Sequence, residues 1–371
     1  MKLIIAQNTF QQCLQRMVSV IPTKTTIPIL TNILFELRGN QLQLTGTDLE
    51  VSIVTTLEVT GETDGMAAFP AKRLFDLIRE LPDTPIVMES DDSHRLVIKT
   101  DKGQYKISGV ASDDYPHIAT EEKTVMLDCQ ASRFTQMVEK AMFAVSTDEL
   151  RTTLMGVLVE LRPQELRVVS TDGHRLAKSV DHKFEYSGDP TQVIIPVKAF
   201  NLLTRNIEQA DNIQFGIGPD HVTFKLGTTA IYSKIISGMY PNYEKVIPAD
   251  NEFELIAERD ILAAAVRRSM IFASQHTRQI KWRLSHNVLT MLAENADIGG
   301  NSEEQIPVEY SGNEMEIGYN AAYILDVLRN LDSERVLFKL QDAGSAAIIE
   351  PVTKQEDLHL MMLLMPIRLN D

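Results

Sequence analysis

The feature that most constrains this 371-residue chain is an internal repeat with a spacing of 124 residues. Residues 33–48 align without a gap with residues 157–172, and both segments end in Thr-Asp. A fainter third copy spans residues 280–295. A period this long is that of a domain rather than that of a solenoid unit. The sequence therefore predicts three similar domains.

Two further blocks recur in the same order. Phe69-Pro-Ala-Lys72 and Ile195-Pro-Val-Lys198 each lead into a helical pattern, as does Gly318-Tyr-Asn320 in the third copy. Tyr115-Pro116 and Tyr240-Pro241 recur at a spacing of 125. Three ordered blocks at nearly one interval indicate a triplication. The expected domains are residues 1–124, 125–250 and 251–371.

Within each copy the pattern predicts a helix, two strands, a second helix and then several strands. Residues 34–44 alternate in polarity around a turn at Asn40, which is typical of a hairpin. Apolar residues in 134–145 recur at helical spacing, and Pro70 and Pro196 suit the first turns of two other helices. The predicted helices are 7–19, 71–80, 131–146, 196–208, 258–271 and 319–331. We therefore expect an α+β fold in which each copy packs two helices on antiparallel sheet.

Composition is typical of a soluble globular protein and excludes several other classes. Apolar residues make up 44% of the chain and charged residues 23%. The longest apolar run, Leu360–Pro366, is far shorter than the roughly 20 residues that span a bilayer, and we expect no signal peptide. Cys13 and Cys129 form neither a disulfide framework nor a zinc cluster, so we expect reduced thiols in a cytoplasmic protein.

The net charge of −15 is unevenly distributed along the chain. The predicted helices together carry a slight positive charge, whereas the predicted strands and loops are acidic. Taken alone, a solvated polar helix face explains this segregation. Repeated domains that turned their helices to one side would instead form a weakly positive lining, which contacts phosphates without reading bases.

The segment Thr171–Ala177 (TDGHRLA) contains the candidate for catalysis. Asp172 and His174 are residue types that act as an acid–base pair or ligate a metal, as in a metal-dependent phosphoesterase. A metal site needs three or four ligands, however, and the other histidines show no ligand spacing. Asp-Gly is also typical of a tight turn, in which Gly173 would accommodate a positive φ. The sequence contains no phosphate-binding glycine motif and no hydrolase nucleophile motif.

The C-terminal run, residues 360–369 (LMMLLMPIRL), is unusual. A buried strand over Leu360–Leu364 would explain its first half. Apolar residues continue past Pro366, although chain ends are normally polar. Methionine-rich surfaces often adapt to the peptides of several partners.

Taken together, these residues resemble the bacterial sliding clamp family, the β subunit of DNA polymerase III. The resemblance runs over the whole chain. It implies a non-enzymatic processivity factor of DNA replication that encircles duplex DNA and tethers the replicative polymerase. Besides the repeat, its marks are residues 30–48 with the LTGTDLE box, 171–177, 240–248, 315–320 and 365–369.

The resemblance implies a head-to-tail homodimer whose six domains close into a ring. Twelve helices about 10 Å apart would surround a hole about 28 Å wide, which admits duplex DNA and water. The seam would pair Tyr105 and Ile107, on an edge strand of the first domain, with Ile271 and Phe272 on a third-domain helix. The residues expected to contact DNA, without sequence preference, are Lys24, Arg73, Arg79, Lys198 and Arg205.

The resemblance also implies a pocket for short peptides of the polymerase, the clamp loader, other polymerases and repair proteins. Such peptides would place glutamine and leucine or phenylalanine anchors in an apolar slot, oriented by Arg175 and the main chain near His174. The expected pocket residues are Leu154, Thr171, Gly173, His174, Arg175, Leu176, Pro241, Val246, Asn320, Tyr323, Leu363, Met365, Pro366, Ile367 and Arg368. No metal, cofactor or membrane is implied. The chain departs from the family pattern at Lys245, where arginine is commoner, and at Asn370-Asp371, which extend past the usual final leucine.

Two alternatives stay open from the sequence. A metal-dependent phosphoesterase would use Asp172 and His174, and would hold a metal and turn over substrate. A scaffold without nucleic-acid contact is distinguished from a clamp only by whether the protein is retained on DNA.

Overall fold

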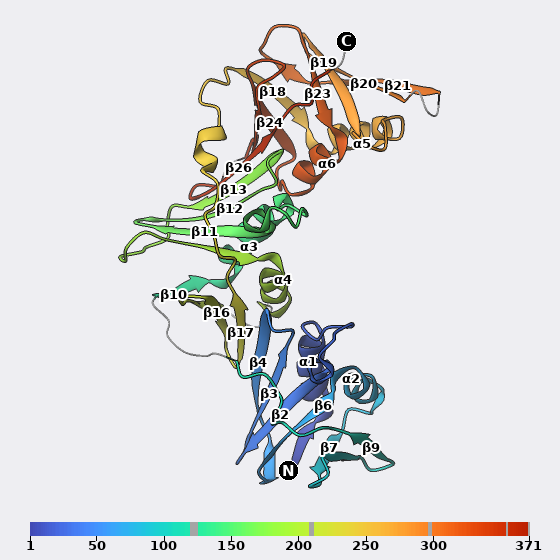
Figure 1. Cartoon of the computed structure of the whole chain (residues 1–371). Coiled ribbons are helices and arrows are strands. Elements are labelled where there is room, and N and C mark those ends of the chain that lie inside the picture. The colour runs from blue at the N-terminus through green and yellow to red at the C-terminus, as the bar shows by residue number, and fades with distance from the viewer. Residues whose placement is uncertain (119–124, 208–210, 296–298, 354, 370–371) are drawn as a thin grey trace. The chain divides into compact units, whose positions relative to one another are not determined.

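The computed structural model describes residues 1–118, 125–207, 211–295, 299–353 and 355–369 (Figure 1). The expected extension, Asn370-Asp371, lies outside the described residues. The chain divides into two compact units, Met1–Thr135 with Ile195–Ile235 and Gln136–Ile194 with Ile236–Asp371. Among the described residues, no helix is long and apolar enough to cross a membrane.

Each predicted helix window contains a helix. The helices are α1 (Gln7–Val18), α2 (Ala71–Glu80), α3 (Ala131–Ala141), α4 (Val197–Asn206), α5 (Arg259–Met270) and α6 (Ala321–Arg329). Short 3-10 turns are η1 (Pro28–Thr31), η2 (Met142–Ala144), η3 (Thr152–Met155) and η5 (Tyr243–Val246). The third helix is shorter than predicted because the chain tightens into η2 after Ala141. Pro70 and Pro196 occupy the N-cap positions of α2 and α4 rather than the first helical turn.

The first unit contains two antiparallel sheets. The five-stranded sheet, in the order β5-β1-β7-β8-β9, consists of β5 (Thr60–Thr63), β1 (Lys2–Ala6), β7 (Pro85–Ser90), β8 (Arg95–Lys99) and β9 (Gln104–Ser108). The eight-stranded sheet, in the order β10-β15-β16-β17-β4-β3-β2-β6, consists of β10 (Val125–Gln130), β15 (Asn212–Ile217), β16 (His221–Leu226), β17 (Thr229–Lys234), β4 (Val51–Glu58), β3 (Gln41–Thr47), β2 (Asn32–Arg38) and β6 (Gly65–Pro70). In this sheet β17 of the middle repeat pairs with β4 of the first repeat.

The second unit also contains two antiparallel sheets. The nine-stranded sheet, in the order β14-β11-β12-β13-β26-β25-β24-β18-β22, consists of β14 (Thr191–Pro196), β11 (Gly156–Arg162), β12 (Glu165–Thr171), β13 (Arg175–Asp181), β26 (Leu358–Leu364), β25 (Ala347–Pro351), β24 (Arg335–Leu340), β18 (Phe253–Glu258) and β22 (Glu309–Tyr310). The four-stranded sheet, in the order β21-β20-β19-β23, consists of β21 (Gly300–Pro307), β20 (Val288–Asn295), β19 (Gln279–Ser285) and β23 (Met315–Asn320). Here β26 of the third repeat pairs with β13 of the middle repeat.

The number of strands between the first two helices differs from the prediction. The chain forms β2 to β6 between α1 and α2, not two strands. The prediction was wrong there by three strands. One of them, β4, is buried along most of its length and therefore lacks the alternation by which a half-exposed strand is recognised. The predicted buried strand near the C-terminus is confirmed as β26.

Each repeat has its own aromatic core. Phe35 makes edge contacts with Phe10 on α1 and with Phe69 on β6, at centroid separations of 6.0 and 5.1 Å. In the third repeat, Trp282 packs edge-on against Tyr319 at 5.2 Å. Burying a side chain of this size stabilises the fold by about 1.5–3 kcal/mol, so the cluster around Phe35 holds α1 on its sheet.

Candidate functional site

The segment Thr171–Ala177 begins as a tight turn between β12 and β13. Asp172 Oδ1 accepts hydrogen bonds from the main-chain N–H groups of His174 (2.9 Å) and Arg175 (3.0 Å). Thr171 Oγ1 accepts a third bond, 3.0 Å long, from the N–H of Gly173, whose φ is +89°. Glycine is favoured at such a φ. The carboxylate proposed for catalysis thus has a structural role in this turn.

Arg175 braces the turn against α6. Its Nη1 donates to Asp326 Oδ2 (2.6 Å) and its Nη2 to the carbonyl oxygen of Phe143 (3.0 Å). Its Nε donates to Asp172 Oδ2 (3.1 Å), and the guanidinium lies 4.5 Å from the ring centroid of Tyr323. The side chain is only 11% exposed. The Arg175 guanidinium therefore links the turn to α6 and to Phe143, and it is not free.

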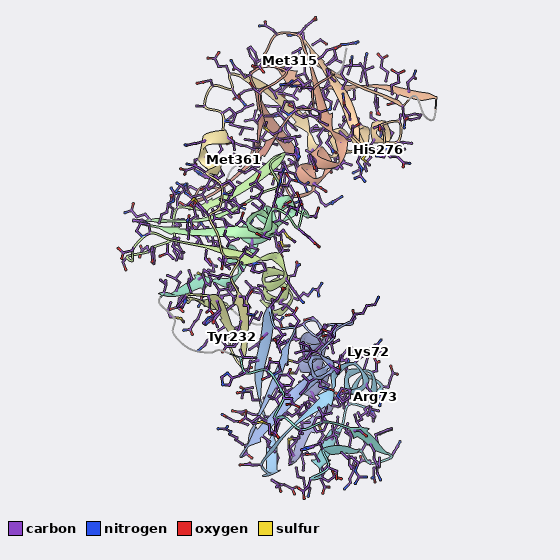
Figure 2. The ribbon with its side chains drawn as sticks, viewed as in Figure 1. Lys72, Arg73, Tyr232, His276, Met315 and Met361 are labelled. Carbon is purple, nitrogen blue, oxygen red and sulfur yellow. The ribbon has the colours of Figure 1, made fainter. Side chains whose placement is uncertain are left out.

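A cavity of about 410 Å³ lies beside this turn, within the second unit. Its apolar side chains include Leu154 on η3, Leu176 on β13 and Leu363 on β26. These leucines belong to a buried cluster that also contains Met361, labelled in Figure 2. An apolar cavity with a few polar groups at its edge is typical of a ligand site. Its lining residues are Leu154, Thr171, Gly173, Arg175, Leu176, Pro241, Asn242, Tyr243, Val246, Pro248, Ser345, Ala346, Leu363 and Met365.

The structure brings nine of the fifteen predicted pocket residues together around this cavity. They are Leu154, Thr171, Gly173, Arg175, Leu176, Pro241, Val246, Leu363 and Met365. Two more lie next to the turn, where the ring of His174 stacks on Tyr323 with centroids 6.3 Å apart. A main-chain hydrogen bond connects this pair to the cavity, because Met365 N–H donates to the carbonyl oxygen of His174 at 2.8 Å.

The remaining four predicted residues do not line the cavity. Asn320 caps α6, where its Oδ1 accepts from the N–H of Ala322 at 2.9 Å. Past Met365 the chain turns toward β23, and Ile367 N–H donates to the carbonyl oxygen of Gly318 at 2.7 Å. The predicted residues in that stretch are Pro366, Ile367 and Arg368.

Five lining residues were not predicted: Asn242, Tyr243, Pro248, Ser345 and Ala346. The first three stand in the segment 240–248, which the sequence already marks by its recurring Tyr-Pro. Extending the pocket along that segment would have found them. Ser345 and Ala346 precede β25 in a turn of small residues, and only tertiary structure brings them to the cavity.

The residues predicted to contact DNA all lie in the first unit: Lys24, Arg73, Arg79, Lys198 and Arg205. All are exposed, and Figure 2 shows Arg73 on α2. Arg79 pairs with Glu80 at 3.2 Å, and Lys198 forms an ion pair with Asp48. Acidic neighbours thus partly neutralise two of the five.

The residues predicted for the dimer seam lie at a sheet edge and at a helix end. Tyr105 and Ile107 are on β9, the last strand of its sheet. Tyr105 is exposed and Ile107 is buried, although both side chains face the same side of β9. Ile271 and Phe272 were predicted to lie on a helix, but α5 ends at Met270, before both of them. Ile271 is the C-cap of α5 and is 69% exposed.

Triplicated α+β domains whose antiparallel sheets are completed by strands of the neighbouring repeat define a clamp-type protein. Family models for the three domains of the DNA polymerase III beta subunit match the chain. The N-terminal domain matches residues 1–119, the central domain 128–242 and the C-terminal domain 244–368.

Relatives match the chain from end to end. It is 31% identical to the beta sliding clamp of Pseudomonas aeruginosa and 30% identical to that of Escherichia coli K12, with 100% of both sequences covered in each case. The crystal structure of the Pseudomonas aeruginosa DnaN sliding clamp bound to griselimycin matches with a TM-score of 0.94 at 31% identity. The Bartonella birtlesii clamp bound to griselimycin matches with a TM-score of 0.93 at 29% identity, and both structures are covered to 100%, as is this chain. The chain therefore belongs to the bacterial beta sliding clamp family, the β subunit of DNA polymerase III.

The protein is accordingly a DNA sliding clamp, a non-catalytic processivity factor of DNA replication. DNA and a DNA polymerase are its partners, and it forms a dimer. The comparisons give no support to a phosphoesterase. The role of Asp172 in the turn explains the conspicuous Asp-x-His spacing without catalysis.

Proposed function

We propose that two copies of the chain close head to tail into a ring around duplex DNA. The cavity beside Thr171–Ala177 would then hold the replicative polymerase, the clamp loader, other polymerases and repair proteins by short peptides. The cavity carries the second part of this proposal, because the leucines at 154, 176 and 363 would accept leucine or phenylalanine anchors. Main-chain groups next to His174 and Met365 would orient the polar residues of such a peptide.

We further propose clamp domains at residues 1–124, 125–250 and 251–371, in line with the three matched ranges. A closed ring needs only weak contacts with DNA, because the duplex cannot leave sideways. Exposed Lys24, Arg73 and Arg205 would supply phosphate contacts without base readout. The surrounding negative charge would discourage DNA from binding elsewhere. We place the protein in the cytoplasm, where bacterial DNA is replicated.

The seam is proposed to join the edge strand β9 to the partner's third domain. Tyr105 on β9 is exposed, and Ile271 at the end of α5 is the more exposed apolar candidate on the other side. Pairing of edge strands across the seam would also protect them from aggregation.

Retention on DNA tests the ring. The clamp is loaded onto a nicked circular plasmid, which is then linearised by a restriction enzyme while bound protein is followed by gel filtration. We expect retention on the circle and loss within minutes from the linear form, because free ends let a ring slide off. Blocking both ends with tightly bound proteins should restore retention. Equal retention on circular and open linear DNA would contradict the proposal.

A further inference from the structure

A buried carboxylate lies behind the cavity wall without lining the cavity. Glu160 on β11 is 7% exposed, and its Oε2 accepts a hydrogen bond of 2.5 Å from the hydroxyl of Tyr243. Arg162 Nη2 donates to both carboxylate oxygens, at 3.2 and 3.3 Å. The ring of Tyr243 belongs to the apolar cluster at the cavity. One end of this tyrosine thus contributes to the wall while the other end is tied to the sheet.

A second tie holds the next residue of the same segment. Glu244 Oε1 accepts from Arg167 Nη1 at 2.5 Å and from Arg162 Nη1 at 3.4 Å. Arg167 Nη1 also donates to the hydroxyl of Tyr243 at 3.3 Å. Two arginines of neighbouring strands, β11 and β12, therefore hold two consecutive residues of η5.

The ionisation of these groups favours the ties. The hydrogen bond from Arg167 lowers the pKa of Glu244, which keeps it a carboxylate. Burial, and then the bond to Glu160, raises the pKa of Tyr243, which keeps its hydroxyl a donor. At neutral pH the Tyr243 hydroxyl therefore donates, and the Glu244 carboxylate accepts.

The segment itself has few main-chain bonds to hold it. Pro241 and Pro248 have no N–H group to donate. Between them η5 belongs to no sheet, and its C-terminal bond, from Ile247 N–H to the carbonyl oxygen of Glu244, is internal and 3.4 Å long. The segment nevertheless places Val246, which is 55% exposed, at the cavity. Its position therefore depends strongly on the side chains of Tyr243 and Glu244.

The first repeat offers a natural comparison. Glu36 and Arg38 stand where the middle repeat has Glu160 and Arg162, and they also form an ion pair. The residue at the position of Tyr243, counted from the recurring Tyr-Pro, is Ile118. Isoleucine has no hydroxyl, so it cannot make this tie. The Glu-x-Arg pair is thus repeated, and the middle repeat adds the tyrosine that uses it.

We propose that Glu160 and Arg167 are positioning residues of the partner site. They hold Tyr243 and the Pro241–Pro248 segment against the sheet, so that the apolar wall is formed before a partner arrives. Preorganisation of this kind raises affinity because less freedom is lost on binding. The inference rests on the proposed function of the cavity, but it assigns a role to residues that do not line it.

Binding of a fluorescein-labelled short peptide with glutamine, leucine and phenylalanine anchors, measured by anisotropy on the full-length dimer, tests this inference. Tyr243→Phe keeps the ring and removes the donor, and Glu160→Ala removes the acceptor. We expect each to raise Kd about three- to tenfold, the size of a typical single hydrogen bond. Glu160→Gln keeps an acceptor oxygen and should recover most of the affinity. The double variant Glu160→Ala/Tyr243→Phe should bind no worse than the weaker single variant, because both remove the same tie.

Two controls separate positioning from general destabilisation. Glu36→Ala removes the equivalent carboxylate of the first repeat. Tyr115→Phe removes a buried hydroxyl that donates to the Thr45 carbonyl oxygen at 2.9 Å in the first unit. Both should leave Kd unchanged. In the free Tyr243→Phe variant the amides of residues 243–246 should exchange with solvent faster, and saturating peptide should restore their protection.

The outcomes distinguish this inference from the proposed function. Wild-type affinity in both Tyr243→Phe and Glu160→Ala, with unchanged amide exchange, overturns the positioning role alone. Failure of the wild type to bind the peptide, or binding that Leu176→Ser leaves intact, overturns the proposed function and this inference with it.

Discussion

The two repeated Thr-Asp turns, at residues 47–48 and 171–172, have the same hydrogen bonds but border cavities of different character. Asp48 Oδ1 accepts main-chain bonds from Glu50 (3.0 Å) and Val51 (2.8 Å), as Asp172 Oδ1 does from the two equivalent residues. Thr47 Oγ1 accepts from the N–H of the residue after the aspartate at 3.0 Å, and so does Thr171 Oγ1. The repeat thus reproduces the backbone of the turn closely.

The side chains next to these turns differ. In the second unit Leu176 pairs with Leu363 across β13 and β26, at a cavity of about 410 Å³. In the first unit the corresponding strands, β4 and β17, pair Ser52 with Tyr232 (labelled in Figure 2), at a cavity of about 260 Å³. One scaffold therefore provides two cavities, and side-chain chemistry decides which of them accepts apolar anchors.

The charged groups follow the same division. The first-unit cavity is lined by three charged side chains, Glu50, Asp220 and Lys234, whereas Arg175 is the one charged side chain among the residues that line the second cavity. Charged groups keep water bound, and leucine anchors would have to displace that water without replacing its hydrogen bonds. The comparison indicates that the proposed partner site differs from the first-unit cavity in its side chains, not in the backbone of its turn.

Exchanging the strand residues that differ between the two cavities, Leu176 and Ser52, should have the largest effect on stability and peptide affinity. Leu176→Ser should lower the free energy of unfolding of the second unit by about 2–5 kcal/mol, because it leaves a cavity in a buried cluster. Peptide affinity should fall at least about tenfold with the loss of a leucine contact. Trp282, the only tryptophan of the chain, is buried in the second unit, so its fluorescence in urea follows this unit.

The matched change is Ser52→Leu. It breaks the 2.7 Å hydrogen bond between Ser52 Oγ and Thr47 Oγ1 and inserts a larger side chain, at a cost of about 1–3 kcal/mol. Peptide affinity should be unchanged, because the second-unit cavity is untouched. Full peptide affinity in Leu176→Ser would show that side-chain chemistry does not separate the two cavities.

Neutralising the two turn aspartates should have a smaller and unequal effect. Asp172→Asn keeps the oxygen that accepts main-chain bonds and removes the ion pair with Arg175, whose partners are 13% and 11% exposed. We expect a loss of about 1–3 kcal/mol. Asp48→Asn removes the pair with Lys198, which is 44% exposed, and should cost about 0–1 kcal/mol. Calorimetric melting of both variants measures the difference, and equal losses would contradict it.

Changing the left-handed residue of each turn should have the smallest effects, with opposite signs. Gly173→Ala should destabilise the second unit by about 1–2 kcal/mol, since φ is +89° there and the new Cβ would lie 3.2 Å from Arg151 Nη1. Leu49 already has a φ of +78°, so Leu49→Gly relieves strain and should be neutral or stabilising by up to about 1 kcal/mol. Melting temperatures give the signs, and a destabilising Leu49→Gly would show that Leu49 contributes packing instead.

The sequence predicts the repeat, the helices and the hairpins because these depend on local periodicity. It misses β4 because a strand buried on both faces loses its alternation, and it misplaces Ile271 because helix ends depend on capping. Nine pocket residues follow from the resemblance to the clamp family, which depends on motifs such as TDGHRLA. Ser345, Ala346 and the link from Tyr243 to Glu160 depend on contacts between distant segments, which no local pattern encodes.

The pairing of β17 with β4 and of β26 with β13 has a consequence for dissecting this protein. The repeats and the two compact units have different boundaries, because each unit contains part of the middle repeat. A fragment cut at residue 124 would keep β4 but lose β17, and so would expose a long row of unsatisfied amides and carbonyls. A fragment that ends after residue 235 preserves that sheet but separates β13 from β26, so strand order, not sequence symmetry, decides what any shortened version of the molecule exposes.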